Sequence, residues 1–183
     1  MPGQEPAELR PAMPHDRKDL AAFLNRARRK ILGSHSGLII SRYREDILLM
    51  LYKRSCLKPD ESNYYVSATE LLFCDSREQT PPAELAAWYL IYNGRILNDA
   101  EPLQELSVKM RAQMVHKIES FLVAAVTQND DPDMFRGPET YEAGDWTYLC
   151  TQHGDFAQFK GEETVFHQDR AVFRGSYMGQ TRT

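Results

Sequence analysis

Two stretches decide the expected fold, AAWYLIYNGR at residues 86–95 and AVFRGSYMGQ at residues 171–180. Each contains an aromatic residue, a tyrosine four positions later and a glycine two positions after that. Aromatic residues favour strands, and residues four apart in a strand face the same side of its sheet. The pattern predicts two aromatic strands that use one face alike, Trp88 with Tyr92 and Phe173 with Tyr177. Gly94 and Gly179 are expected to let the chain leave these strands sharply.

Two further landmarks recur in the same order and suggest an internal duplication. FLNRA at 23–27 and FLVAA at 121–125 both have helical character, and the intervals Tyr65 to Cys74 and Tyr141 to Cys150 are equally long. One such unit would bury too little apolar area to fold alone. We therefore expect an α+β fold in which two degenerate helix–β-meander copies pack antiparallel sheet against helices. Copy one covers about 16–100 and copy two about 101–180.

Hydrophobic periodicity places the individual elements along the chain. It predicts helices over 16–32, 42–54 and 102–127, and strands over 64–76, 86–97, 145–151, 161–167 and 171–178. Residues 1–15 are rich in proline and polar residues and are expected to form a flexible lead. A single domain is expected over 16–183.

Composition narrows the class of protein. The chain has 183 residues and a formal net charge of −4, so nucleic acid is not an expected partner. No apolar run approaches the length that crosses a bilayer, and the first residues do not resemble a secretion signal. The three cysteines are sparse and lack CxxC spacing, which favours neither a disulfide framework nor a zinc site. A reducing cytoplasm is the expected compartment.

Candidate chemistry is limited to a few side chains. Cys150 and His153 could form a nucleophile and base, but three positions along a strand place them on opposite faces, and a small buried thiol is the simpler interpretation. The acidic loop at 130–133 lacks the ligand spacing of a calcium site. The basic RARRK run at 26–30 fits a solvated helix end. Gly-rich phosphate loops, Gly-x-Ser-x-Gly and His-Glu-x-x-His are all missing, which weighs against the common enzyme classes.

The second half carries an ordered set of short motifs. They are Arg136-Gly137, then Tyr141, Gly144, Asp145 and Tyr148, then Gly154-Asp155, then Phe159, Gly161 and Glu163, and finally Phe173, Tyr177 and Gly179. This order resembles the uncharacterised prokaryotic family called domain of unknown function 5680, best over 121–179. The resemblance implies no established activity. Relatives fused to helix-turn-helix segments imply a sensing or regulatory role, although no tight helix-turn-helix is evident here.

We therefore expect a non-enzymatic, cytoplasmic bacterial module that binds a protein or a small molecule, on the sheet face or between the copies. It is expected to need no cofactor and no metal. Arg136, Asp145, Tyr148, Glu163 and Tyr177 are the expected ligand-binding residues.

Two alternatives remain open. One is a small, metal-assisted hydrolase that uses the carboxylates of Asp145, Asp155 and Glu163 with His153 or His167. The other is an effector or immunity protein of bacterial conflict.

Overall fold

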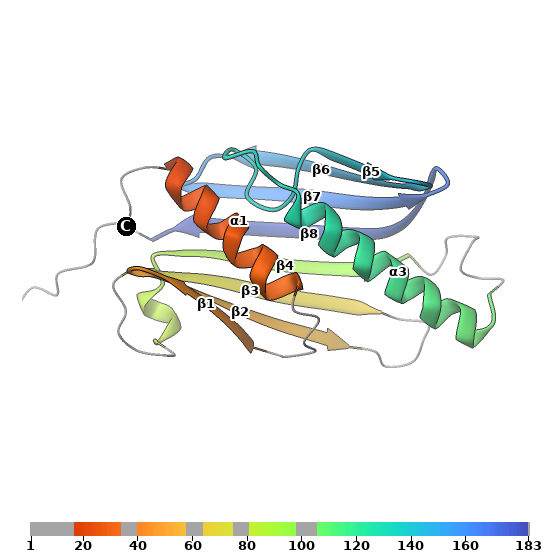
Figure 1. The fold of residues 1–183 in the computed structure, drawn as a ribbon, viewed down its shortest axis with the longest axis horizontal. Helices are drawn as coiled ribbons and strands as arrows, with labels where there is room; N and C mark the ends of the chain where they lie inside the picture. The colour runs from red at the N-terminus through yellow and green to blue at the C-terminus, as the bar shows by residue number, and fades with distance from the viewer. Residues whose placement is uncertain (1–16, 34–39, 58–63, 75–80, 98–105, 183) are drawn as a thin grey trace, which may run out of the picture.

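The fold is a single antiparallel sheet with helices on one face (Figure 1). The computed structural model describes residues 17–33, 40–57, 64–74, 81–97 and 106–182. Its elements are α1 (Arg17–Gly33), β1 (Ile40–Glu45), β2 (Leu48–Leu57), β3 (Tyr65–Cys74), the 3-10 turn η1 (Ala83–Leu85), β4 (Trp88–Ile96), α3 (Val108–Thr127), β5 (Thr140–Ala143), β6 (Trp146–Gly154), β7 (Gln158–His167) and β8 (Arg170–Thr181). The expected α+β class, with antiparallel sheet packed against helices, is confirmed.

The order of the eight strands is β1-β2-β3-β4-β8-β7-β6-β5. The meander β1–β4 follows α1, the meander β5–β8 follows α3, and the two meanders join where β4 pairs antiparallel with β8. At this junction Tyr92 lies directly opposite Tyr177. The two aromatic strands singled out in the sequence are therefore neighbours at the centre of the sheet.

The predicted helix over 42–54 is wrong, because this segment forms the hairpin β1–β2. The chain turns at Asp46, which has φ of 50°. The apolar run that follows is buried on both faces of the sheet: Met50 and Tyr52 join the main core, whereas Leu49 and Leu51 join a second cluster with Phe73 and Ala86. A run buried on both sides has no alternation, so its periodicity does not separate strand from helix.

Two landmarks of the sequence also need correction. Tyr65 to Cys74 spans the single strand β3, whereas Tyr141 to Cys150 spans the hairpin β5–β6, so the equal spacing does not mark equivalent positions. Gly94 and Gly179 lie inside paired strands and not at strand exits. A methyl group at Gly94 would collide with the rings of Phe173 and Tyr92, and one at Gly179 would collide with the ring of Phe159.

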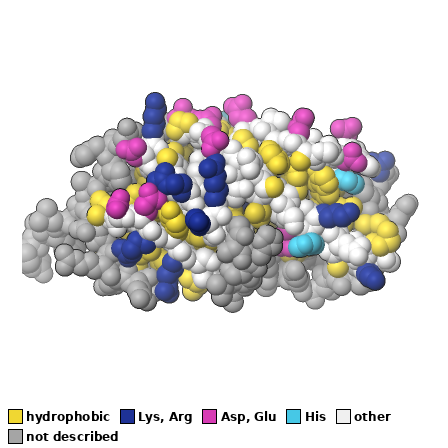
Figure 2. All heavy atoms as spheres, in the orientation of Figure 1, with side chains coloured by type: hydrophobic (Ala, Val, Ile, Leu, Met, Phe, Trp, Pro, Cys, Tyr) yellow, Lys and Arg dark blue, Asp and Glu magenta, His cyan; other side chains and the backbone are white. Residues whose placement is uncertain are grey.

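The main core lies between the sheet and the helices. Leu20, Phe23, Leu24 and Ala27 of α1 pack into it, together with Ile118, Phe121, Leu122 and Ala125 of α3. Trp88 stacks on Phe159 with ring centroids 5.8 Å apart. The solvent-facing surface on the helix side of the molecule carries both basic and acidic side chains (Figure 2). Neither described helix is long and apolar enough to cross a membrane.

A substitution at Gly161 tests whether the Tyr177 ring packs directly on the sheet. It lies opposite Tyr177, and a methyl group there would meet that ring and the backbone oxygen of Thr151. We expect Gly161→Ala to lower the free energy of unfolding in urea by about 1–3 kcal/mol, because the core must shift to admit the methyl group. Glu162→Ala, at the exposed neighbouring position, is the matched control and should change little. A Gly161→Ala protein as stable as the wild type would contradict the packing described here.

Candidate functional site

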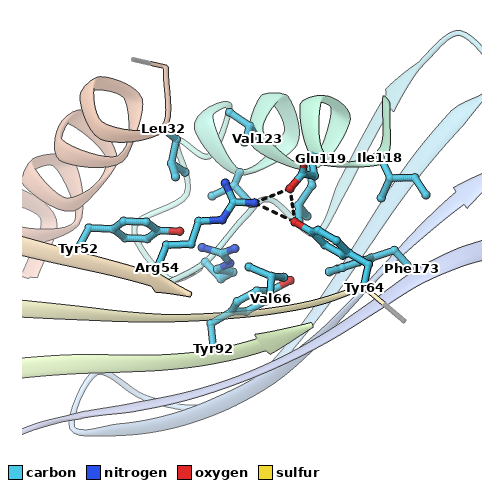
Figure 3. A pocket seen from close by; sticks show the side chains of 13 residues that line it. Leu32, Tyr52, Arg54, Tyr64, Val66, Tyr92, Ile118, Glu119, Val123 and Phe173 are labelled. Carbon is cyan, nitrogen blue, oxygen red and sulfur yellow. Dashed lines mark hydrogen bonds and ion pairs between the residues drawn. The ribbon is translucent and has the colours of Figure 1, made fainter. Parts of the chain in front are cut away.

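A small cavity of about 30 Å³ lies between α3 and the strands β2–β4 (Figure 3). Tyr52, Val66 and Tyr92 line it from the sheet, and Ile118 and Val123 line it from α3. A water molecule needs at least about 10–15 Å³ of such space, so the cavity holds roughly two waters.

The outer part of the lining is polar and partly exposed. Arg54 Nη2 donates to Glu119 Oε1 at 2.6 Å and to the Tyr64 hydroxyl at 3.0 Å, and that hydroxyl also donates to Glu119 (Figure 3). The side chains of Arg54 and Glu119 are 32% and 23% exposed. This triad therefore lies between the cavity and solvent.

Arg136 lines the inner part of the cavity. Its guanidinium carbon is 4.2 Å from the centroid of the Tyr92 ring, a cation–π distance. Arg136 Nε is 3.5 Å from Glu163 Oε2, and Nη1 is 3.6 Å from Glu70 Oε1. Because Glu163 is in β7 and Glu70 is in β3, this one guanidinium connects the two meanders.

The segment that follows α3 holds Arg136 in place through its own hydrogen bonds. Asn129 is buried, and its Nδ2 donates to the Met134 carbonyl at 2.6 Å. The Phe135 backbone N–H donates to Gln152 Oε1 at 2.9 Å, and Gln152 Nε2 donates to the Asp133 carbonyl at 2.6 Å. The position of Arg136 is therefore fixed by hydrogen bonds within residues 129–135 and by hydrogen bonds between this segment and β6.

Further contacts complete a buried charge cluster, whose members are Arg28, Glu70, Tyr92, Arg136, Tyr148 and Glu163. Arg28 of α1 donates to both carboxylate oxygens of Glu70 at 2.5–3.0 Å. The Tyr148 hydroxyl donates to Glu163 Oε2 at 2.8 Å. Arg28, Glu70, Arg136 and Glu163 are each at most 3% exposed. Two buried cations thus balance two buried anions, which is the condition under which ions tolerate burial.

Some buried polar atoms of this cluster make no hydrogen bond. Nε and Nη1 of Arg136, Oε1 of Glu163 and the hydroxyl of Tyr92 are buried and have no hydrogen-bond partner within the described part of the chain. A buried polar atom without a partner costs about 1–3 kcal/mol, and more when it is charged. The hydrogen-bonding capacity of the cluster is therefore not fully used, although Arg136 Nε and Nη1 lie 3.5 and 3.6 Å from carboxylates, and two of its members, Arg136 and Tyr92, line the cavity.

The ionisation of these groups follows from their burial. Burial by itself would lower the pKa of Arg136, but Glu163, Tyr92 and Glu70 raise it well above its ordinary value, so the guanidinium stays charged. Burial, reinforced by Glu163, raises the pKa of Tyr92 and of Tyr148. Both tyrosines are therefore neutral hydroxyl groups near neutral pH.

Tyr177 and Cys150 form a pair next to the charge cluster, since Cys150 lies opposite Glu163 in the sheet. The Cys150 sulfur is 3.3 Å from the Tyr177 hydroxyl, and burial raises the pKa of both groups. Cys150 is thus a buried thiol, whereas His153 is exposed on β6, and the structure does not bring the two together.

Four of the five expected site residues meet in this region: Arg136, Tyr148, Glu163 and Tyr177. Asp145 does not join them, because it lies exposed in the β5–β6 turn, where Gln168 Nε2 donates to its Oδ2 at 3.3 Å.

The side chains of the alternative hydrolase are also apart. Asp145 and Asp155 flank opposite ends of β6, and the Asp155 carboxylate accepts backbone N–H groups of its own turn. His167 lies against Trp146, with ring centroids 4.3 Å apart. Among the described residues, no three His, Cys, Asp or Glu side chains group as metal ligands.

Arg28, Glu70 and Tyr92 belong to the cluster but were not among the expected ligand-binding residues. Arg28 lies in the basic run at 26–30, and the interpretation of that run as a wholly solvated helix end is wrong at this position, since Arg28 is 1% exposed. A signal was present, because Arg28 follows Leu24 by four residues on the apolar face of its helix.

Comparisons with known proteins identify a family but no activity. A family model described as "Domain of unknown function (DUF5680)" matches residues 76–181. No significant match was found among curated proteins or among solved structures.

The Arg28–Glu70 pair allows a double-mutant test of the buried charges. Arg28→Met or Glu70→Leu alone leaves an uncompensated charge in the core, and each should lower the free energy of unfolding by about 3–5 kcal/mol. The double variant should recover most of this loss, because it removes both charges and keeps the volume. Arg26→Met, at an exposed pair with Glu45, is the control and should cost much less. Additive losses in the double variant, measured by denaturant unfolding, would contradict a coupled pair.

The raised pKa values of the buried tyrosines predict sensitivity to alkali. The unfolded chain loses these protons near the ordinary tyrosine pKa of 10.0, whereas folding raises the pKa of Tyr92, Tyr148 and Tyr177 above it. The unfolded state therefore binds fewer protons above this pH, and stability is lost as the pH rises further. We expect the thermal midpoint to fall above pH 10 and part of the tyrosinate absorbance to appear only with loss of the circular dichroism signal. Complete tyrosine ionisation in a folded protein would contradict the burial.

Proposed function

Because the chain belongs to the DUF5680 family, for which no activity is described, we propose its function from the site itself: it is a non-enzymatic module that binds a small polar ligand beneath α3. The observation that carries this proposal is that Arg136 and Tyr92 line the cavity with buried polar atoms that make no hydrogen bond within the described part of the chain. A ligand that pairs with these atoms would recover the free energy that their isolation costs.

The charges of the cluster favour a ligand without net charge. Arg28 and Arg136 already balance Glu70 and Glu163, so an added ion would be buried without a counter-charge. Within the cavity lining, the Arg136 N–H groups require an acceptor, and the Tyr92 hydroxyl can accept from a donor. A compact molecule that carries an acceptor and a donor, such as an amide or a urea, fits both groups.

Entry of anything larger than water requires the outer triad to move. Arg54, Tyr64 and Glu119 hold one another between the cavity and solvent; Arg54 and Glu119 are partly exposed, whereas Tyr64 is buried. Outward rotation of the two partly exposed side chains, Arg54 and Glu119, exchanges their ion pair for contacts with water, which costs little at such positions. The proposed site is therefore gated by side chains and needs no movement of the sheet.

The proposal of a non-enzymatic role is supported by the ionisation of the site. Arg136 is held charged, the nearby tyrosines are held neutral, and Cys150 is held as a thiol, so none of these four groups exchanges a proton readily near neutral pH. The proposed compartment is the cytoplasm, which suits the free thiols of Cys74 and Cys150.

We also propose that the two meanders with their helices descend from one duplicated unit. Glu70 lies opposite Leu90, two residues before Tyr92, and Glu163 lies opposite Gly175, two residues before Tyr177. The third strand of each meander thus carries a buried carboxylate at the same place relative to a central tyrosine. An alignment of relatives in which these two acidic positions vary without relation to each other would count against this origin.

Native mass spectrometry of the purified chain tests the binding proposal. We expect a small neutral adduct, or a thermal midpoint raised by acetamide or urea at low concentration, with loss of either effect in Arg136→Lys, because the flat guanidinium fork is lost while the charge remains. If that variant folds poorly, Arg136→Met with Glu163→Met keeps the charges balanced. Arg26→Met is the matched surface control.

Absence of any adduct, together with no response of the thermal midpoint to either amide probe, would refute a ligand site in this cavity. An adduct that survives equally in Arg136→Lys and in the double variant would show that the ligand lies elsewhere.

A further inference from the structure

The face of the sheet opposite the helices carries a groove that crosses the strands. Its volume is about 470 Å³, and its lining includes Ile91, Asn93, Ser176 and Met178 at the junction of β4 and β8. Ile91 and Met178 lie opposite each other and are 41% and 57% exposed. This groove is separate from the cavity beneath α3, and nothing in the proposed function depends on it.

Strand register explains why the groove exists. One row of polar side chains crosses five strands side by side, four of them short: Ser67, Asn93, Ser176, Glu162 and Thr151. The next row on one side holds Tyr65, Arg95, Arg174 and Thr164, and the next row on the other side holds Lys53, Thr69, Ile91, Met178 and Lys160. At β4 and β8 the short Asn93 and Ser176 lie between the longer Arg95 and Arg174 on one side and Ile91 and Met178 on the other, which leaves a trough with a hydrogen-bonding floor.

Cations lie in and beside this trough: Lys160 lines it, whereas Lys53, Arg95 and Arg174 lie in the rows that flank its floor. Lys53, Arg95, Arg174 and Lys160 are all exposed, and none of the four has an ion-pair partner within the described residues. Glu162 is the acidic member of the floor. In a chain whose net charge is −4, this face therefore concentrates unpaired positive charge.

The central pair of cations is unfavourable for folding. Arg95 and Arg174 lie directly opposite each other on β4 and β8. Like charges at directly opposed positions of a sheet destabilise the pair. A destabilising arrangement on an otherwise regular surface is typical of a position kept for binding.

We propose that this groove binds an acidic polypeptide segment that contains an apolar residue. The cations extend from Lys53 on β2 to Lys160 on β7, four strand spacings or about 19 Å apart, which exceeds the reach of one small anion. An extended peptide of about six residues covers that distance. Its acidic side chains meet the four cations, its apolar side chain packs on Ile91 and Met178, and its backbone amides meet Asn93, Ser176 and Glu162.

The same features favour polypeptide over nucleic acid. Single-stranded nucleic acid is held by aromatic side chains on which successive bases stack. The floor of this groove is formed by serine, asparagine, threonine and glutamate; the rings in its lining are His153 and Tyr177, of which Tyr177 is only 3% exposed, and the Glu162 carboxylate would repel a phosphate. A peptide backbone, in contrast, carries N–H groups that a carboxylate accepts.

Fluorescence anisotropy with a labelled peptide of about eight residues, rich in glutamate around a central leucine, tests the proposal on the full chain. We expect saturable binding that weakens as salt rises, and about a tenfold loss of affinity in Arg95→Glu with Arg174→Glu. Lys109→Glu with Lys117→Glu changes the net charge equally on the exposed surface of α3, and this matched control should bind as the wild type does. The same peptide with lysine in place of glutamate should not bind.

A second measurement separates binding from folding. Arg95→Glu alone places opposite charges across β4 and β8, so we expect its thermal midpoint to rise by about 1–2 °C while peptide affinity falls. Tighter binding of an oligothymidine of equal length would overturn the proposal in favour of nucleic acid. Equal losses in the α3 control, or no binding of the acidic peptide, would overturn it outright.

Discussion

The contacts of the Arg136 guanidinium are the interactions on which the joining of the two meanders depends most. It lies against the ring of Tyr92 and within 3.6 Å of carboxylates from both meanders, Glu163 on β7 and Glu70 on β3. Burying it requires counter-charges, and those counter-charges in turn need further partners, which Arg28 and Tyr148 supply. One buried cation thus ties together α1, the segment after α3 and two distant strands. Loss of any one of the four ions would leave a net charge in the core.

The glycines of the central strands make room for this cluster. Gly94 and Gly175 lie opposite each other on β4 and β8, and side chains there would collide with the ring of Tyr92. Gly161 does the same for Tyr177. The rings can therefore lie flat on the sheet, which keeps Tyr92 under the guanidinium and brings the Tyr177 hydroxyl to Cys150. The glycines of these strands are needed because they leave space for the rings; their backbone angles are ones that other residues also adopt.

The two faces of the sheet differ in shape and in charge. The face beneath the helices combines balanced buried charges with a cavity of about 30 Å³, which is why we propose a small molecule without net charge as its ligand. The opposite face is open across the β4–β8 junction and carries cations without partners among the described residues. A sheet one layer thick separates them, and Tyr177 contributes to the environment on both sides.

The sequence by itself determined the α+β class, the two aromatic strands, the helix at the start of each half, and, through their motifs, three members of the buried cluster and the neighbouring Tyr177. These features are local or repeat at a fixed spacing, so they can be read along the chain. Tertiary structure alone decided that residues 42–54 form strands, because burial on both faces of a sheet outweighed a helical composition. It also decided that Arg28 and Glu70 belong to the cluster while Asp145 does not. The physical reason is that the free energy of a buried charge depends on its counter-ions, and here those counter-ions come from segments far apart in the chain.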